Sequence, residues 1–154
     1  MKNKLLLVLA VGWVMWTLTT PRTLAQEQLS GNKVYLDKNC QRQQQLPPVE
    51  RFTVFYQSEF QAVDEIYWFS AGRYQDGAVL FCISQPNFNQ AQVLNEKTIQ
   101  NQFIEKIIKA PNSNSIFLIT VAEGNGRNVP LTDYKLDLFD PNQPVLTRLG
   151  VRSN

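Results

Sequence analysis

The chain has 154 residues, with 15 basic and 13 acidic side chains and no histidine. Without histidine, the Ser-His-Asp and Cys-His classes of hydrolase are excluded, together with histidine-ligated zinc, copper and haem. The sequence also lacks a Walker loop and a Gly-x-Gly-x-x-Gly motif. It therefore implies no cofactor and no catalytic residue.

Residues 1–25 have the composition of a secretory signal peptide. Two lysines precede an apolar run over residues 5–18, and a short segment ending in Ala25 follows. This order predicts cleavage after Ala25, so that the mature chain begins at Gln26. As a helix the run would be about 21 Å long, shorter than the roughly 30 Å hydrocarbon core of a bilayer. The alternative is an uncleaved anchor, with the two tryptophans of the run at the membrane interface.

Removal of this segment changes the charge balance of the protein. Residues 1–25 contain three basic and no acidic side chains, which leaves 12 basic and 13 acidic residues in the mature chain. Nucleic acids and anionic lipids need clustered positive charge, and no such cluster remains. We therefore expect neither a nucleic-acid partner nor stable membrane insertion after cleavage.

Two cysteines, Cys40 and Cys82, remain in the mature chain. In an oxidising compartment such a pair is typical of a single disulfide, although two separate buried thiols are the alternative. Residues 26–51 are polar and rich in glutamine, and they indicate an N-terminal arm that the disulfide ties to the rest. Residues 52–154 are then one domain.

The domain begins with segments typical of strands. Aromatic and β-branched residues dominate 52–56 and 66–71, with a connection between them at 58–65. Asp76-Gly77 is a two-residue hairpin signal of type I′. Residues 78–84 are apolar on both faces, which predicts a strand buried on both sides.

Residues 98–109 are predicted to form an amphipathic helix that lies on the sheet. Thr98 or Asn95 is its expected cap, and Pro111 ends it. The apolar side chains recur at intervals of three and four residues and cover one side of the helix: Ile99, Phe103, Ile104, Ile107 and Ile108.

Three further segments, 116–122, 134–139 and 145–149, are predicted as strands, the first of them central and the last an edge. Strands joined by hairpins around one helix indicate an α+β domain in which an antiparallel sheet carries the amphipathic helix. A small β-barrel with one helix is the alternative.

Two places in the mature chain are candidate binding sites. The glycine-rich loop 123–128 offers Glu123, Asn125 and Arg127, of which the arginine suits a carboxylate, although a plain hairpin loop explains the glycines equally well. Trp68 either lies beneath the N-terminal arm or offers a stacking surface to a partner. Asp137, Asp140 and Asn142 could offer oxygens to calcium, but calcium-binding loops space several acids more densely, so no metal site is predicted.

Together these features predict an exported, non-enzymatic binding or accessory domain that contacts a protein or a small ligand. We expect it to be secreted or periplasmic, in the bacterial envelope or outside the cell, with a bacterial source assumed. A small secreted hydrolase with a carboxylate pair is the alternative, because two such groups need only be close in space. The identity of the partner does not follow from the sequence.

Overall fold

The computed structural model describes residues 33–43, 51–124, 126 and 128–153. The described residues form a fold that is nearly all antiparallel β-sheet, with 60% of them in strands and 3% helical. Its elements in chain order are β1 (Tyr35–Leu36), β2 (Arg42–Gln43), β3 (Phe52–Ala62), β4 (Glu65–Arg73), β5 (Ala78–Gln85), the short 3-10 turn η1 (Pro86–Phe88), β6 (Asn89–Val93), β7 (Gln102–Lys109), β8 (Ile116–Ala122), β9 (Leu131–Asp137) and β10 (Val145–Arg152).

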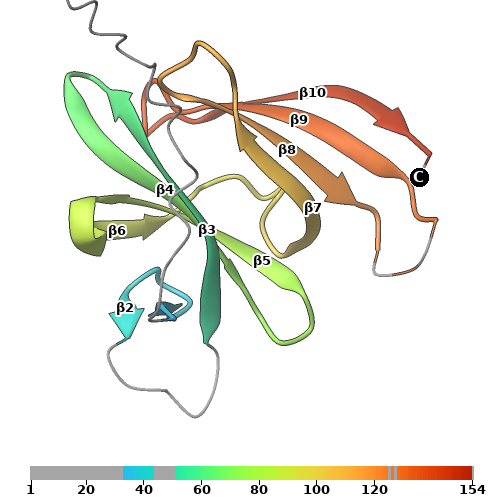
Figure 1. Cartoon of the computed structure of the whole chain (residues 1–154), viewed down its shortest axis with the longest axis horizontal. Coiled ribbons are helices and arrows are strands. Elements are labelled where there is room, and N and C mark those ends of the chain that lie inside the picture. Colours follow the sequence, from blue (N-terminus) through green and yellow to red (C-terminus); the bar gives the residue numbers. More distant parts are fainter. Residues whose placement is uncertain (1–32, 44–50, 125, 127, 154) are drawn as a thin grey trace, which may run out of the picture.

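The strands form one ten-stranded sheet in the order β10-β9-β8-β7-β5-β4-β3-β1-β2, and β6 pairs with β5 beside this path. Every pairing is antiparallel, as expected where short connections join successive strands. Figure 1 shows the sheet strongly twisted, with β3–β5 crossing in front and β7–β10 spreading to one side. The red strand β10 lies at an outer margin of the sheet.

The sheet folds over on itself, so that one face of it makes the core. On this inner face the ring of Phe117 in β8 lies 4.5 Å from that of Phe69 in β4 and 6.0 Å from that of Phe60 in β3. The backbone N–H of Gln61 donates to the carbonyl of Asn114 at 3.2 Å, which joins the end of β3 to the β7–β8 turn. Two halves of one sheet therefore supply the two layers of the core.

The central strand β5 is buried on both faces, as its unbroken apolar sequence predicted. Phe81 and Ile83 lie in the inner core, whereas Leu80 and Cys82 lie in a second cluster on the opposite, outer face. This outer cluster consists of Leu36, Cys40, Phe52, Val54, Leu80, Cys82 and Phe88.

The predicted helix is wrong, and with it the α+β fold class and the alternative that also contained a helix. Residues 102–109 form β7, which pairs with β5 and β8. The reason is a β-bulge: the register of β7 against β8 shifts between Ile104 and Lys106, and Glu105 is the extra residue. A bulge changes the alternation of faces, so Ile104 and Ile107, three residues apart, both point into the core. This spacing imitates a helical period.

The side chain of Gln100 fills a gap in the sheet. β5 pairs with β6 around Cys82 and with β7 around Val79, which leaves the backbone of Phe81 between two partners. The Gln100 Oε1 accepts from the Phe81 N–H at 2.9 Å, and its Nε2 donates to the Phe81 and Leu94 carbonyls at 3.0 and 2.7 Å. One amide side chain thus takes the place of a neighbouring strand.

Two hairpins differ from their predicted form. The predicted connection 58–65 is wrong, because β3 and β4 continue to a two-residue turn at Val63 and Asp64, whose φ angles are 46° and 64°. The hairpin at Asp76-Gly77 is confirmed, but it is not type I′. Gly77 has a φ of 96°, while Asp76 is not among the positive-φ residues of the described chain. Its carboxylate instead accepts from the Ala78 N–H at 2.9 Å.

The predicted disulfide between Cys40 and Cys82 is present, with 5.8 Å between the two Cα atoms. It joins the N-terminal arm to β5 within the outer cluster. Leu36 in β1 is completely buried there, and β1 pairs with the start of β3. The arm, where described, is therefore packed on the sheet.

The predicted signal segment 1–25 lies outside the described residues. In the part of the chain that the structure covers, no helix has the length and apolar character required to cross a bilayer.

Candidate functional site

The predicted loop site is only partly within the described structure. Asn125 and Arg127 lie outside the described residues. Glu123 follows β8 and is exposed, and its Oε1 accepts a hydrogen bond from the Thr132 hydroxyl at 2.9 Å. The Glu123 N–H donates to the Pro130 carbonyl at 2.9 Å, which closes the loop. The carboxylate of Glu123 thus has a local partner in β9.

Trp68 lies in another part of the sheet, on the outer face of β4. Its ring makes an edge contact with Phe88 at 5.4 Å between centroids, and its Nε1 donates to Glu59 Oε1 at 3.3 Å. The side chain is half-buried against the outer cluster, the same cluster that contains the disulfide. The structure therefore does not bring Trp68 and Glu123 into one site.

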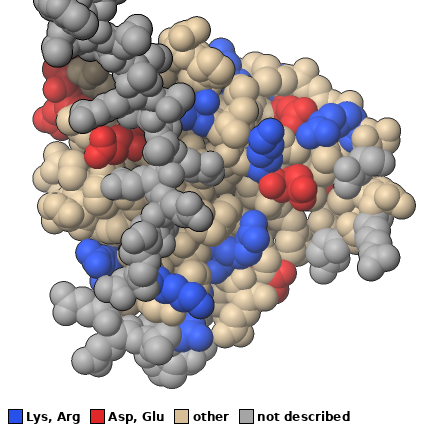
Figure 2. Space-filling model, viewed as in Figure 1, with Lys and Arg blue, Asp and Glu red and all other residues tan. Residues whose placement is uncertain are grey.

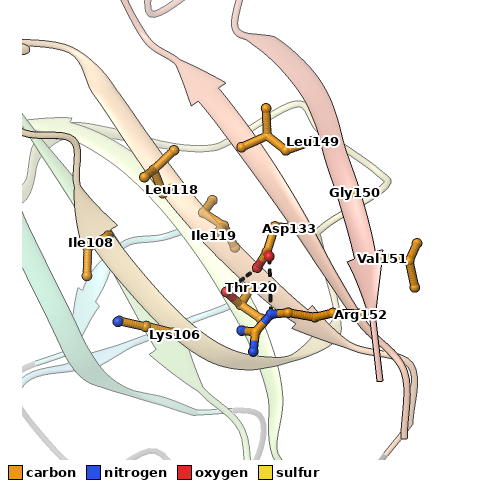
Figure 3. A pocket seen from close by; sticks show the side chains of 10 residues that line it. All are labelled: Lys106, Ile108, Leu118, Ile119, Thr120, Asp133, Leu149, Gly150, Val151 and Arg152. Atoms are coloured by element: carbon orange, nitrogen blue, oxygen red, sulfur yellow. Dashed lines mark hydrogen bonds and ion pairs between the residues drawn. The ribbon is translucent and has the colours of Figure 1, made fainter. Parts of the chain in front are cut away.

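A hollow of about 430 Å³ lies instead on the outer face of β7–β10. Figure 3 shows the polar side chains of Thr120, Asp133 and Arg152 grouped together, with Leu118 and Leu149 to one side of them. The lining comes from all four strands: Lys106, Ile108, Leu118, Ile119, Thr120, Asp133, Leu149, Gly150, Val151 and Arg152.

Strand register explains why these residues meet. Lys106 in β7 pairs with Thr120 in β8, Thr120 pairs with Asp133 in β9, and Asp133 pairs with Gly150 in β10. Directly paired residues point to the same face of a sheet, so the four form a row across the outer face. Gly150 keeps the end of this row open, since a Cβ placed there would meet no atom within 4 Å.

Asp133 is the electrostatic centre of the hollow. Its Oδ1 accepts from the Thr120 hydroxyl at 2.6 Å, and its Oδ2 accepts from Arg152 Nε at 3.3 Å. The Thr120 hydrogen bond lowers the pKa of Asp133 below its ordinary value; partial burial opposes this, while Arg152 and then Lys106 add to it. Asp133 is therefore ionised at neutral pH, and its negative charge positions the Arg152 side chain.

The hollow combines charge with apolar surface. Lys106 and Arg152 carry two positive charges against the single negative charge of Asp133. Its aliphatic lining residues are Ile108 and Leu118 from β7 and β8, with Leu149 and Val151 from β10. In the described residues no group of three or more Cys, Asp or Glu side chains could hold a metal ion. Such a surface suits a ligand that joins an anionic group to an apolar body.

Sequence reasoning missed this site because its residues span positions 106–152 and converge only through register. One local signal exists: Thr120 is the polar residue within the otherwise apolar segment 116–122. A buried hydroxyl in such a strand needs a partner, and Asp133 supplies it.

Comparison of the chain with family models, with curated proteins and with solved structures gave no match.

Proposed function

We propose that the protein is an exported binding domain without catalytic activity, and that the hollow on β7–β10 takes a ligand with an anionic group beside an apolar body. Export is supported by the composition of residues 1–25 and by the disulfide, which is typical of oxidising compartments. The expected location is the periplasm or the medium.

The observation that carries this proposal is the hydrogen bonding of the Asp133 carboxylate. Its two carboxylate oxygens already accept hydrogen bonds from Thr120 and Arg152. Because only the Nε of Arg152 makes this bond, its terminal nitrogens can still donate, as can the ammonium group of Lys106. Charge-assisted hydrogen bonds from these groups would hold an anion at the polar end, and the aliphatic walls would bury its apolar part.

A carboxylate-pair hydrolase receives less support from the hollow. Glycoside hydrolysis of this kind uses two carboxyl groups, roughly 5–10 Å apart across the bond that is cleaved. Among the lining residues only Asp133 is acidic. Its lowered pKa also makes it a poor proton donor near neutral pH, whereas a general acid requires a raised pKa.

Binding can be tested by nuclear magnetic resonance of the full mature protein with three probes. Octanoate has both features, octyltrimethylammonium has the apolar body with the opposite charge, and acetate has the charge alone. We expect octanoate to shift the amide resonances of β7–β10 at the lowest concentration. Stronger shifts from octyltrimethylammonium, or octanoate shifts confined to other strands, would contradict the proposal.

Three variants locate the effect. Lys106→Gln should weaken octanoate binding by about tenfold, as expected for the loss of one charge-assisted hydrogen bond. Gly150→Val should abolish it by filling the open end of the row without altering a charge. Lys97→Gln, at an exposed position outside the hollow, is the matched control and should bind octanoate as the natural protein does.

A further inference from the structure

Within the described residues, β10 is an edge strand of the sheet. It is the last strand in the sheet order, and β9 is its only partner among the strands described. It has eight residues, and three large apolar side chains on it are more than half exposed: Val145 at 58%, Leu149 at 57% and Val151 at 52%. The outward N–H and C=O groups of an edge strand are unpaired, so such an edge can accept a further strand.

The charges of β10 decide what kind of strand fits. Arg148 and Arg152 are both exposed, and β10 contains no acidic residue. If two copies paired through this edge, four guanidinium groups would lie along the strand pair, two on each face, and neither copy of β10 would supply an acid. Like charges opposite one another destabilise a strand pair. The arginines therefore disfavour a second copy and favour a segment with acidic side chains.

We propose that the free edge of β10 accepts an extended acidic segment of another protein as an additional strand. This proposal rests on the proposed binding function and names its partner. Arg148 pairs with Tyr134, which packs against the inner core, whereas Arg152 bonds Asp133 on the outer face, so the two arginines lie on opposite faces of β10. An acidic side chain of the segment would therefore lie beside one arginine on each face, and an apolar one would cover Val151 on the inner face and Leu149 on the outer. Backbone hydrogen bonds along β10 supply attachment, while acidic and apolar side chains on both faces of the segment supply selectivity.

The hollow and the edge belong to one continuous surface. Leu149, Gly150, Val151 and Arg152 belong both to β10 and to the lining of the hollow. A strand beside β10 would extend the outer face by one position, next to the row that runs from Lys106 to Gly150. One carboxylate of the segment can then reach the positive charge of the hollow while its backbone pairs with the edge.

A bulge and exposed arginines also occur on edges that proteins protect from pairing. β10 has both, since its register against β9 shifts between Arg148 and Gly150. Protection alone predicts that no peptide pairs with β10, whatever its charge. The two interpretations therefore differ in a measurable result.

The test uses the mature protein and a capped peptide in which two glutamates and two valines follow one another in turn, so that each face of the extended peptide carries both residue types. A peptide with lysine in place of glutamate is its charge-reversed counterpart. Hydrogen exchange measured residue by residue should show the outward amides of β10 slowed in the presence of the acidic peptide. Arg148→Glu should weaken that peptide at least about tenfold and strengthen the basic one, because the pairing is charge-selective. Lys97→Glu makes the same charge change away from β10 and should alter neither affinity.

Three outcomes would overturn the proposal. One is an unchanged exchange rate in β10 while octanoate still binds the hollow, which would leave the proposed function intact. Another is equal loss of affinity in Arg148→Glu and Lys97→Glu, which indicates unspecific attraction. The third is protection of the same amides in a dimer seen by sedimentation without peptide. If octanoate also fails to bind, the proposed function fails as well.

Discussion

The outer face of this sheet has two regions whose polar side chains are bonded differently: a covered face on β4 and β5, and an open face on β8 and β9. On β4 and β5 the N-terminal arm and the disulfide cover the sheet. Ser70 and Ser84 there are 1% and 2% exposed, and among the described residues their hydroxyl groups have no hydrogen-bond partner. On β8 and β9 the face is open, and Thr120 donates to Asp133. The covered face is thus built for packing, whereas the open face retains organised charge. Figure 2 likewise shows basic and acidic side chains interspersed on the face in view.

Removing the disulfide should have the largest effect on stability, because the disulfide attaches the N-terminal arm to the covered face. We expect Cys40→Ser with Cys82→Ser to lower the free energy of unfolding by about 2–5 kcal/mol. Denaturant unfolding measures this loss. A reductant should weaken the natural protein to a similar extent and leave the double variant unchanged. Equal stability of the two proteins in oxidising buffer would show that packing alone holds the arm.

The open face should respond to loss of its central hydrogen bond. Thr120→Val keeps the shape of the side chain but removes the donor to Asp133. We expect a loss of about 1 kcal/mol at neutral pH, at the low end for a bond to a charged group because Asp133 is partly exposed. Chemical denaturation at pH 7 provides the measurement.

The pH dependence of this loss gives a second readout. The pKa of Asp133 is lowered in the folded protein, first by the Thr120 hydrogen bond. Its contribution to stability is therefore present above the unfolded-state pKa of about 3.9 and disappears as the pH falls through the folded-state value. In Thr120→Val the carboxyl resonance of Asp133 should titrate at higher pH, and the stability difference between the two proteins should shrink in acid. An unshifted titration would show that another group lowers this pKa.

The smallest effect, and one of opposite sign, is expected on the covered face. Ser70→Ala or Ser84→Ala removes a buried hydroxyl that has no partner within the described part of the chain, so each should stabilise the protein by about 1 kcal/mol. Ser115→Ala is the matched control, since the Ser115 hydroxyl is also buried but donates to Asp137 at 3.2 Å. The control should be destabilised. A loss of stability in all three variants would contradict the proposed difference in hydrogen bonding between the covered face and the open face.

Local features of the sequence predicted those parts of the fold that depend on neighbouring residues. The hairpin at Asp76-Gly77 was predicted because glycine readily adopts the left-handed backbone, and Gly77 does so. The burial of β5 on both faces followed from its unbroken apolar sequence. The helix over 98–109 was wrong because a bulge at Glu105 puts two strand positions three residues apart on one face. A single sequence carries no mark of such a bulge.

Composition and cysteine count, without any structure, were enough to predict the disulfide and to exclude histidine chemistry, because both follow from which side chains exist. Tertiary structure decided which side chains meet. Lys106, Thr120, Asp133 and Gly150 form one row only because three successive strand pairings bring their backbones into register. Register depends on the packing of the entire inner core, and moving one strand by a single residue would turn these side chains to the other face.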